Sequence, residues 1–193
     1  MSPQSVWINT SSVPSTVPIG TGGRRAAIGG VIAGNGVLAG NAADTNFVFP
    51  MTTTIPAGTL LNDGDMLEIR WTAQLSAAVS TKTYQTNFGY TSTGVGGFTG
   101  GTNVQSSATA TASVMIWSTI RIRRINNTNV RYETIAVFSN GSFQATNASA
   151  TIGSLDLTNT TYNLGIGIQD GTGNANAIQH VESTVEFMPA AVP

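Results

Sequence analysis

The feature that most constrains the fold is a two-residue alternation of apolar and polar side chains in short segments. Residues 66–75 show it most clearly, because Leu67, Ile69 and Trp71 alternate with Glu68 and Arg70. This period places one face of an extended strand in a core and the other in water. The same alternation recurs in residues 162–169 and 178–188, whereas no segment keeps a helical period over several turns. The sequence therefore predicts an all-β protein.

The length and the spacing of these segments predict one sandwich domain with an N-terminal extension. The chain has 193 residues, a length typical of one domain. Residues 1–43 are rich in Gly, Ser and Pro and have few large side chains, so we expect an extended arm there. Residues 44–193 are expected to form an antiparallel β-sandwich of the jelly-roll type, since polar outer faces and long loops favour a sandwich over a barrel. Residues 89–103 and 139–151 are predicted to be long polar loops.

Two strands, residues 114–125 and 130–138, flank an Asn-rich turn. A two-residue loop would place Arg124 opposite Arg131, so like charges would face each other. A loop with an odd number of residues instead places Ile122 opposite Thr134 and lets Arg123 face Glu133. We therefore predict the odd-numbered loop, with an Asn in the left-handed conformation.

The chain carries few charges, and this restricts its partners. Lys and Arg number 8 and Asp and Glu 9, so 9% of the residues are charged and the net charge is −1; about 25% is usual. We therefore expect neither nucleic acid nor a membrane as a partner. The absence of cysteine excludes disulfides and thiolate metal sites.

The residues that could support catalysis or metal binding have simpler interpretations. The single histidine, His180, alternates in phase with Glu182 and is predicted to be solvated or interfacial. Asp63 and Asp65 flank Gly64, where turn acceptors are more common than calcium ligands. We therefore predict no enzymatic activity and no cofactor or metal. Half of the basic residues lie on one hairpin, where an Arg–Glu ladder or a subunit interface is favoured over a nucleic-acid patch: Arg121, Arg123, Arg124 and Arg131.

Three stretches carry a resemblance to a known group of proteins. IPAGTLLNDGDMLEI (55–69), LDLT (155–158) and TVEF (184–187) resemble the β-sandwich domains of tailed-bacteriophage virion proteins, which include capsid decoration (cement) proteins and head or tail fibre domains. The resemblance implies a jelly-roll-like domain, commonly trimeric, on the outer surface of a virion after synthesis in the host cytoplasm.

The first functional hypothesis is a non-enzymatic phage structural protein that decorates the capsid, with residues 1–43 docking onto the major capsid protein or another virion protein. The alternative is a fibre protein that binds a host receptor or surface glycan through residues 90–98 and 139–147. A second alternative is the coat protein of a small virus, which would be expected to have a more basic arm than this chain has.

Two sets of residues are candidate interfaces. The arm offers small apolar side chains for docking, namely Ile28, Val31, Ile32, Val37 and Leu38. The sandwich offers large apolar groups on a polar face and side-chain-free positions for close approach, as expected of a self-associating protein, namely Met115, Trp117, Gly165 and Gly167. The resemblance implies that the assembly is a homotrimer.

Overall fold

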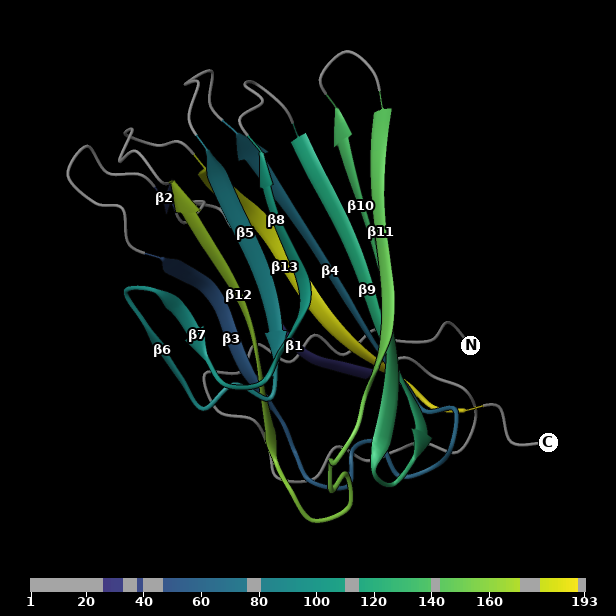
Figure 1. Ribbon diagram of the computed structural model, residues 1–193. Helices are drawn as coiled ribbons and strands as arrows, with labels where there is room; N and C mark the ends of the chain where they lie inside the picture. Colours follow the sequence, from purple (N-terminus) through teal and green to yellow (C-terminus); the bar gives the residue numbers. More distant parts are fainter. Residues whose placement is uncertain are drawn as a thin grey trace, which may run out of the picture.

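The protein is a sandwich of two antiparallel sheets, which face each other as two layers (Figure 1). The computed structural model describes residues 26–32, 38–39, 47–75, 81–109, 115–139, 143–170 and 178–190, and these form strands, turns and loops without a helix. No helix that could cross a membrane occurs in these ranges. The predicted all-β, jelly-roll-like sandwich is confirmed.

The larger sheet has seven strands. Its order is β1-β13-β4-β9-β10-β11, and β2 also pairs with β13. The strands are β1 (Ala26–Ile32), β2 (Leu38–Ala39), β4 (Met66–Leu75), β9 (Met115–Asn126), β10 (Asn129–Ser139), β11 (Phe143–Ile152) and β13 (Ile178–Met188).

The smaller sheet has four strands in the order β3-β12-β5-β8, and a separate hairpin, β6–β7, accompanies it. The strands are β3 (Val48–Ile55), β5 (Lys82–Phe88), β8 (Thr102–Thr109) and β12 (Tyr162–Asp170), with β6 (Ser92–Gly94) and β7 (Gly97–Thr99).

The core lies between the two sheets. Leu67, Ile69 and Trp71 of β4 are at most 1% exposed, as their alternation predicts. Trp71 Nε1 donates a hydrogen bond of 3.0 Å to Gln105 Oε1 of β8, and the Trp71 ring meets Tyr84 of β5 edge-on at 5.3 Å. The two sheets are therefore joined by one apolar core with a polar contact inside it.

The turn before β4 has the hydrogen bonds that its sequence predicts. Asp65 Oδ2 accepts backbone N–H groups of Leu61 and Asn62 at 2.9 and 2.7 Å, and Gly64 has a φ of 96°. Asp65 is thus a turn acceptor, as predicted. Its other oxygen accepts the Ala190 N–H at 2.8 Å, which ties the turn to the end of β13.

The two predicted polar loops are largely strand. Residues 89–103 contain β6, β7 and the start of β8, and β11 covers residues 143–152 and pairs with β10 throughout. The prediction was wrong because β11 contains mainly Ala, Ser, Thr and Asn, which lack an apolar alternation. Its position beside a single neighbour, at the edge of the sheet, lets such a sequence form a strand.

The β9–β10 hairpin corrects the predicted loop. Asn126 pairs with Asn129 around a two-residue turn, and a bulge at Ile125 then places Arg124 opposite Val130. Ile122 lies opposite Tyr132, not Thr134, and Arg123 lies opposite Arg131, with Glu133 as its diagonal neighbour. The bulge shifts the register by one residue, so like charges do face each other. The predicted left-handed Asn is wrong too, since Ser154 is the only non-glycine residue with positive φ in the described part of the chain.

A second bulge corrects the prediction for His180. His180 pairs with Ala73 and Glu182 with Thr72, so Val181 is the extra residue on β13. The bulge turns His180 toward the core, where its side chain is fully buried, whereas Glu182 stays exposed. An uninterrupted alternation would have placed both on one face.

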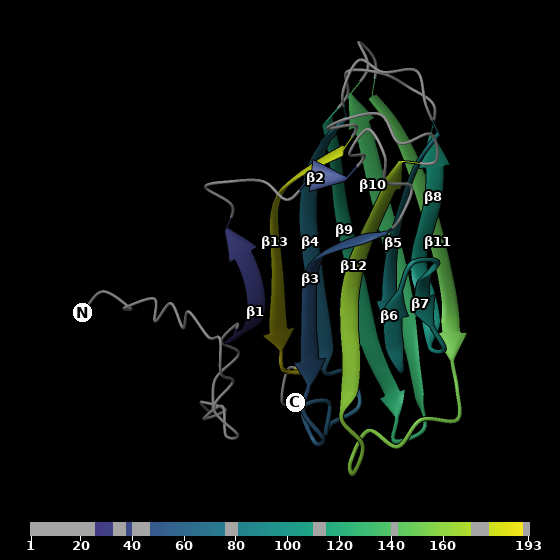
Figure 2. The same ribbon diagram turned by 90° about the vertical axis from the view of Figure 1, so that its left-hand side faces the viewer.

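Part of the predicted arm belongs to the sandwich. β1 and β2 lie within residues 1–43 and pair with β13, and Figure 2 shows β1 beside β13 at the edge of the larger sheet. The remaining residues of that segment lie outside the described part, so the predicted boundary at residue 43 stays a prediction.

Candidate functional site

Charged side chains gather on the outer face of the larger sheet, the face turned away from the smaller sheet. Strand pairing aligns Glu186, Glu68, Arg121 and Glu133 in one row across β13, β4, β9 and β10. Arg121 Nε donates a hydrogen bond of 2.9 Å to Glu68 Oε2, and Arg70 donates to Glu68 Oε1. An Arg–Glu ladder is therefore present on this face.

Glu68 lies at the centre of the ladder. Its side chain is only 1% exposed, although the alternation predicted a solvated position. Burial by itself would raise the pKa of this carboxyl, but hydrogen bonds from Arg121 and Arg70 hold the pKa below its usual value. Glu68 is therefore a buried carboxylate that keeps its charge through two guanidinium groups.

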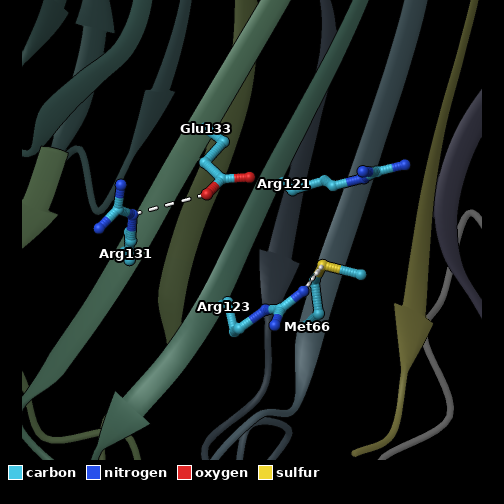
Figure 3. A pocket seen from close by; sticks show the side chains of 5 residues that line it. All are labelled: Met66, Arg121, Arg123, Arg131 and Glu133. Atoms are coloured by element: carbon cyan, nitrogen blue, oxygen red, sulfur yellow. Dashed lines mark hydrogen bonds and ion pairs between the residues drawn. The ribbon is translucent and has the colours of Figure 1, made fainter. Parts of the chain in front are cut away.

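The neighbouring row contains a shallow hollow. Met66, Arg123 and Arg131 face one another across β4, β9 and β10. Together with Arg121 and Glu133 they line a space of about 290 Å³, which we call the arginine hollow. Figure 3 shows the Glu133 carboxylate between Arg131 and Arg121, and Arg123 reaching toward Met66.

The contacts within the arginine hollow are weak. Arg123 Nη2 approaches Met66 Sδ at 3.9 Å, a weak acceptor. Arg131 Nε lies 3.5 Å from Glu133 Oε1, and both side chains are more than half exposed. Three guanidinium groups and one carboxylate thus border the space.

An apolar patch adjoins the charged rows on the same face. Trp117 of β9 is 40% exposed and Ile135 of β10 is 54% exposed. Val137 lies opposite Trp117, and Thr119 lies opposite Ile135, so the two exposed side chains are diagonal neighbours. We call Trp117, Ile135 and Val137 the Trp117 platform. Arg70 borders it, because Arg70 pairs with Thr119 from β4.

The predicted arginine cluster is divided between two places. Arg121, Arg123 and Arg131 lie on the outer face, but Arg124 lies at the end of the sandwich. Arg124 donates to Leu60 O at 2.6 Å and to Asp63 Oδ1 at 3.1 Å. Arg124 therefore stabilises the turn before β4 and does not line the hollow.

The predicted interface residues of the sandwich fall on different faces. Met115 lies on β9 two positions before Trp117 and is half-buried. Gly165 and Gly167 lie on β12, in the smaller sheet. A Cβ at Gly165 would lie 2.7 Å from Phe98 Cε1, and one at Gly167 would lie 3.1 Å from Phe47 Cδ1. The close approach expected there is thus made by aromatic rings of the same chain.

These rings cover the outer face of the smaller sheet next to the β6–β7 hairpin. Phe49 meets Phe98 edge-on at 5.0 Å, and Tyr90 packs on Phe98 at 4.8 Å. Gly165 and Gly167 therefore lack side chains because aromatic rings of the same chain occupy the space next to them. Their part in an oligomer interface stays a prediction.

The predicted docking residues of the arm can be placed only along the backbone. Ile28, Val31 and Ile32 lie on β1, and Leu38 lies on β2. Val37 lies outside the described residues. Docking through them stays a prediction.

Titratable side chains are also buried between the sheets. His180 has no hydrogen-bond partner for either ring nitrogen among the described residues, and burial lowers its pKa to about 4. Lys82 lies opposite Asp170 across β5 and β12; burial lowers the lysine's pKa, and the Asp170 charge opposes that shift. No group of three or more metal-ligating His, Asp or Glu side chains occurs in the described part of the chain.

Sequence reasoning missed Met66 and Ile135 as parts of the outer face. Ile135 follows Arg131 and Glu133 at two-residue spacing, so an apolar side chain at an outward position could have been noticed. Met66 could not have been recognised from the sequence, because its place in the hollow depends on the β4–β9 register.

No family model and no curated protein matches the chain. Among solved structures, the chain is similar to peanut lectin in complex with a nine-residue peptide, with a TM-score of 0.50 and 8% identity over 87% of this chain and 92% of the lectin chain. It also matches the CBM2 module of the evolved Dit of Lactobacillus casei BL23 phage J-1, with a TM-score of 0.37 and 11% identity over 89% of this chain and 99% of that module. The likeness to the lectin shows a shared β-sandwich fold.

Proposed function

We propose that the chain is a non-enzymatic glycan-binding protein of a phage particle, and that it binds sugar on the outer face of its larger sheet. The observation that carries this proposal is the Trp117 platform, an exposed indole beside an exposed Ile135 and next to charged side chains. The proposal keeps the receptor- or glycan-binding hypothesis from the sequence but moves the binding surface from the loops to the sheet.

The platform has the two properties that a sugar ring requires. One face of a pyranose carries C–H groups, which stack on the electron-rich face of an indole and on aliphatic side chains. The rim of the ring carries hydroxyl groups, which need donors and acceptors nearby. Arg70, Glu133 and Thr119 provide both around Trp117 and Ile135.

The position of the platform on paired strands also supports the proposal. β9 lies between β4 and β10, and both pairings continue through Trp117. Side chains on such a sheet are held more precisely than side chains on loops. A site that is ordered before binding loses less conformational entropy when the ligand arrives.

The remaining hypotheses from the sequence stay predictions. Capsid decoration depends on docking by residues 1–43, most of which lie outside the described part of the chain. Virion location and assembly as a homotrimer are proposed on the resemblance to phage sandwich proteins alone. Light scattering on the purified protein would test the trimer.

The test is binding of the purified full chain to a microarray of bacterial capsular, lipopolysaccharide and cell-wall glycans, followed by calorimetry with a bound oligosaccharide. We expect binding to at least one glycan and a loss of affinity of about tenfold or more in Trp117→Ala. Trp117→Phe should retain part of the affinity. Val95→Ala is the matched control, because Val95 is an exposed apolar residue at the β6–β7 turn.

Two results would overturn the proposal. One is wild-type protein that binds no glycan, and the other is Trp117→Ala with unchanged affinity. If Trp117→Ala instead abolished binding to purified capsids while no glycan bound, the platform would be a protein-docking surface.

A further inference from the structure

We propose that the arginine hollow binds the carboxylate of an acidic sugar, so that the glycan recognised by this face is an acidic polysaccharide. This inference rests on the proposed function and names its ligand class.

The first support is a pair of like charges. Arg123 and Arg131 lie directly opposite each other on β9 and β10, and both are exposed on the outer face. Like charges in this arrangement destabilise a sheet. An anion between the two guanidinium groups would remove the repulsion and form charge-assisted hydrogen bonds with both.

The second support comes from comparing the two adjacent rows. Glu68 of β4 faces Arg121 and Glu133 of β10 faces it from the other side. Arg123 in the next row is faced by Met66 on β4. The β4 residue opposite the arginine is thus a glutamate for Arg121 and a methionine for Arg123. Among the described residues Arg123 has no carboxylate partner, and its hydrogen bond is with the weak acceptor Met66 Sδ, which a carboxylate would outcompete.

The third support is the weakness of the contact that a ligand would displace. The Arg131–Glu133 pair spans 3.5 Å, and its side chains are 56% and 57% exposed. Exposed pairs of this kind contribute little to stability. Arg131 can therefore turn to an incoming carboxylate without weakening the fold.

The acids around the hollow favour a sugar over a dense polyanion. Glu133 lines the space itself, and Glu68 and Glu186 continue the adjacent row. These carboxylates accept hydrogen bonds from hydroxyl groups but repel a chain with a charge on every unit, such as DNA. The volume of about 290 Å³ lies at the lower end of the range for small-ligand sites. A single sugar unit with one carboxylate fits the small volume of the hollow, and its hydroxyl groups can donate hydrogen bonds to the surrounding acids.

The hollow and the platform lie along the same strand. Arg121 and Trp117 both project outward from β9, and four residues of strand span about 13 Å. This distance is longer than one sugar ring. An oligosaccharide could therefore stack one unit on Trp117 while an acidic unit enters the arginine hollow.

The experiment compares one polymer in two chemical forms, using hyaluronan oligomers, in which every second unit carries a carboxylate, and the same oligomers with their carboxylates reduced to alcohols. Polygalacturonate oligomers, a sulfated glycan and double-stranded DNA extend the set. We expect an acidic oligomer to bind at least tenfold more tightly than its reduced form, with affinity falling as salt rises. Arg123→Gln should remove that preference, and Glu133→Gln, which takes away a carboxylate that repels the ligand, should increase it.

The outcomes separate this inference from the proposed function. If neutral glycans bind as tightly as acidic ones and Arg123→Gln changes nothing, the hollow is not an anion site, although the platform still binds sugar. If the sulfated glycan or DNA binds more tightly than any carboxylated oligomer, the ligand class is wrong. If no glycan of either kind binds, both the proposed function and this inference fail.

Discussion

Arg121 and Glu68 form a 2.9 Å hydrogen bond between β9 and β4, in which the carboxylate is buried and the guanidinium is half exposed. Removing the arginine takes away one of the two guanidinium groups of the described residues that hydrogen-bond Glu68, and Arg70 still donates to it. We expect Arg121→Gln to lower the free energy of unfolding by about 1–2 kcal/mol, because a buried carboxylate loses a charge-assisted hydrogen bond. Arg131→Gln, which breaks an exposed pair, should change it by less than about 0.5 kcal/mol. Urea unfolding of both variants is the measurement, and equal effects would contradict the expectation.

The same carboxylate gives the protein an acid-sensitive contribution to stability. The folded pKa of Glu68 lies below its ordinary value of 4.5, so the unfolded chain takes up the proton first as pH falls. The contribution is therefore fully present above about pH 4.5 and is lost as pH falls through the folded pKa. Arg121→Gln should raise the folded pKa of Glu68 toward the unfolded value, so the loss of stability should become smaller and should end at a higher pH, which denaturation curves between pH 5 and 3 would detect.

His180 is expected to act in a different pH range. Its pKa is about 4 in the folded protein and 6.5 in the unfolded chain, so the unfolded state binds a proton more readily. The free energy of unfolding should therefore fall from pH 6.5 to pH 4, by up to about 3 kcal/mol. His180→Leu should abolish this slope, as measured by urea unfolding at several pH values. A slope unchanged by the substitution would show that His180 is not its source.

The expected effect of His180→Ala follows from the corrected position. A histidine on the polar face would tolerate truncation with little loss of stability. A fully buried one leaves a cavity when it is truncated, so we expect a cost of about 2–4 kcal/mol. Thermal unfolding of His180→Ala distinguishes a buried histidine from an exposed one.

Trp71 and Trp117 offer a comparison between the two faces of one sheet. Trp71→Ala should cost about 3–5 kcal/mol, because the ring is 1% exposed and contacts Gln105 and Tyr84. Trp117→Ala should cost about 1 kcal/mol or less, since its ring is 40% exposed. Calorimetry on both variants checks the difference. Equal costs would mean that Trp117 supports the fold and is not reserved for a ligand.

Gly165 provides a steric test of the aromatic cover on the smaller sheet. A Cβ there would lie 2.7 Å from Phe98 Cε1, so Gly165→Ala should displace the Phe98 ring and cost about 1–3 kcal/mol. Gly94→Ala, on β6, meets nothing within 4 Å and should be nearly neutral. Near-ultraviolet circular dichroism would report the movement of the rings, and an unchanged spectrum in Gly165→Ala would count against this packing.

The sequence predicted the strands with a clear alternation and failed where the alternation is interrupted. β4 and β13 match their predicted bounds because an inward apolar side chain recurs at nearly every second position. The bulge at Val181 moved His180 to the other face, and the bulge at Ile125 shifted the β9–β10 register by one residue; no residue type at these positions signals a bulge. The strand β11 was missed because its residues are small and polar.

The candidate site was less predictable than the fold. The arginine cluster and Trp117 were recognisable from the sequence, since arginines are rare in this chain and an outward tryptophan breaks the alternation. The hollow depends on which strands are neighbours, as Met66 and Arg131 come from strands far apart in the chain. The need for a glycine at position 165 likewise depends on contact with the ring of Phe98, which comes from another segment of the chain.

The pairing of β1 with β13 has a consequence for the order of folding. Ala26 pairs with Phe187, so a strand near the N-terminus joins one close to the end of the chain. During synthesis β1 must wait until β13 has left the ribosome, and contacts over such a separation form slowly. Until then the segment is open to chaperones, proteases or a second copy of the chain. Residues 1–25 precede β1, so their removal should leave the pairing of β1 with β13 intact, whereas removal of 1–43 takes β1 and β2 and exposes the edge of β13.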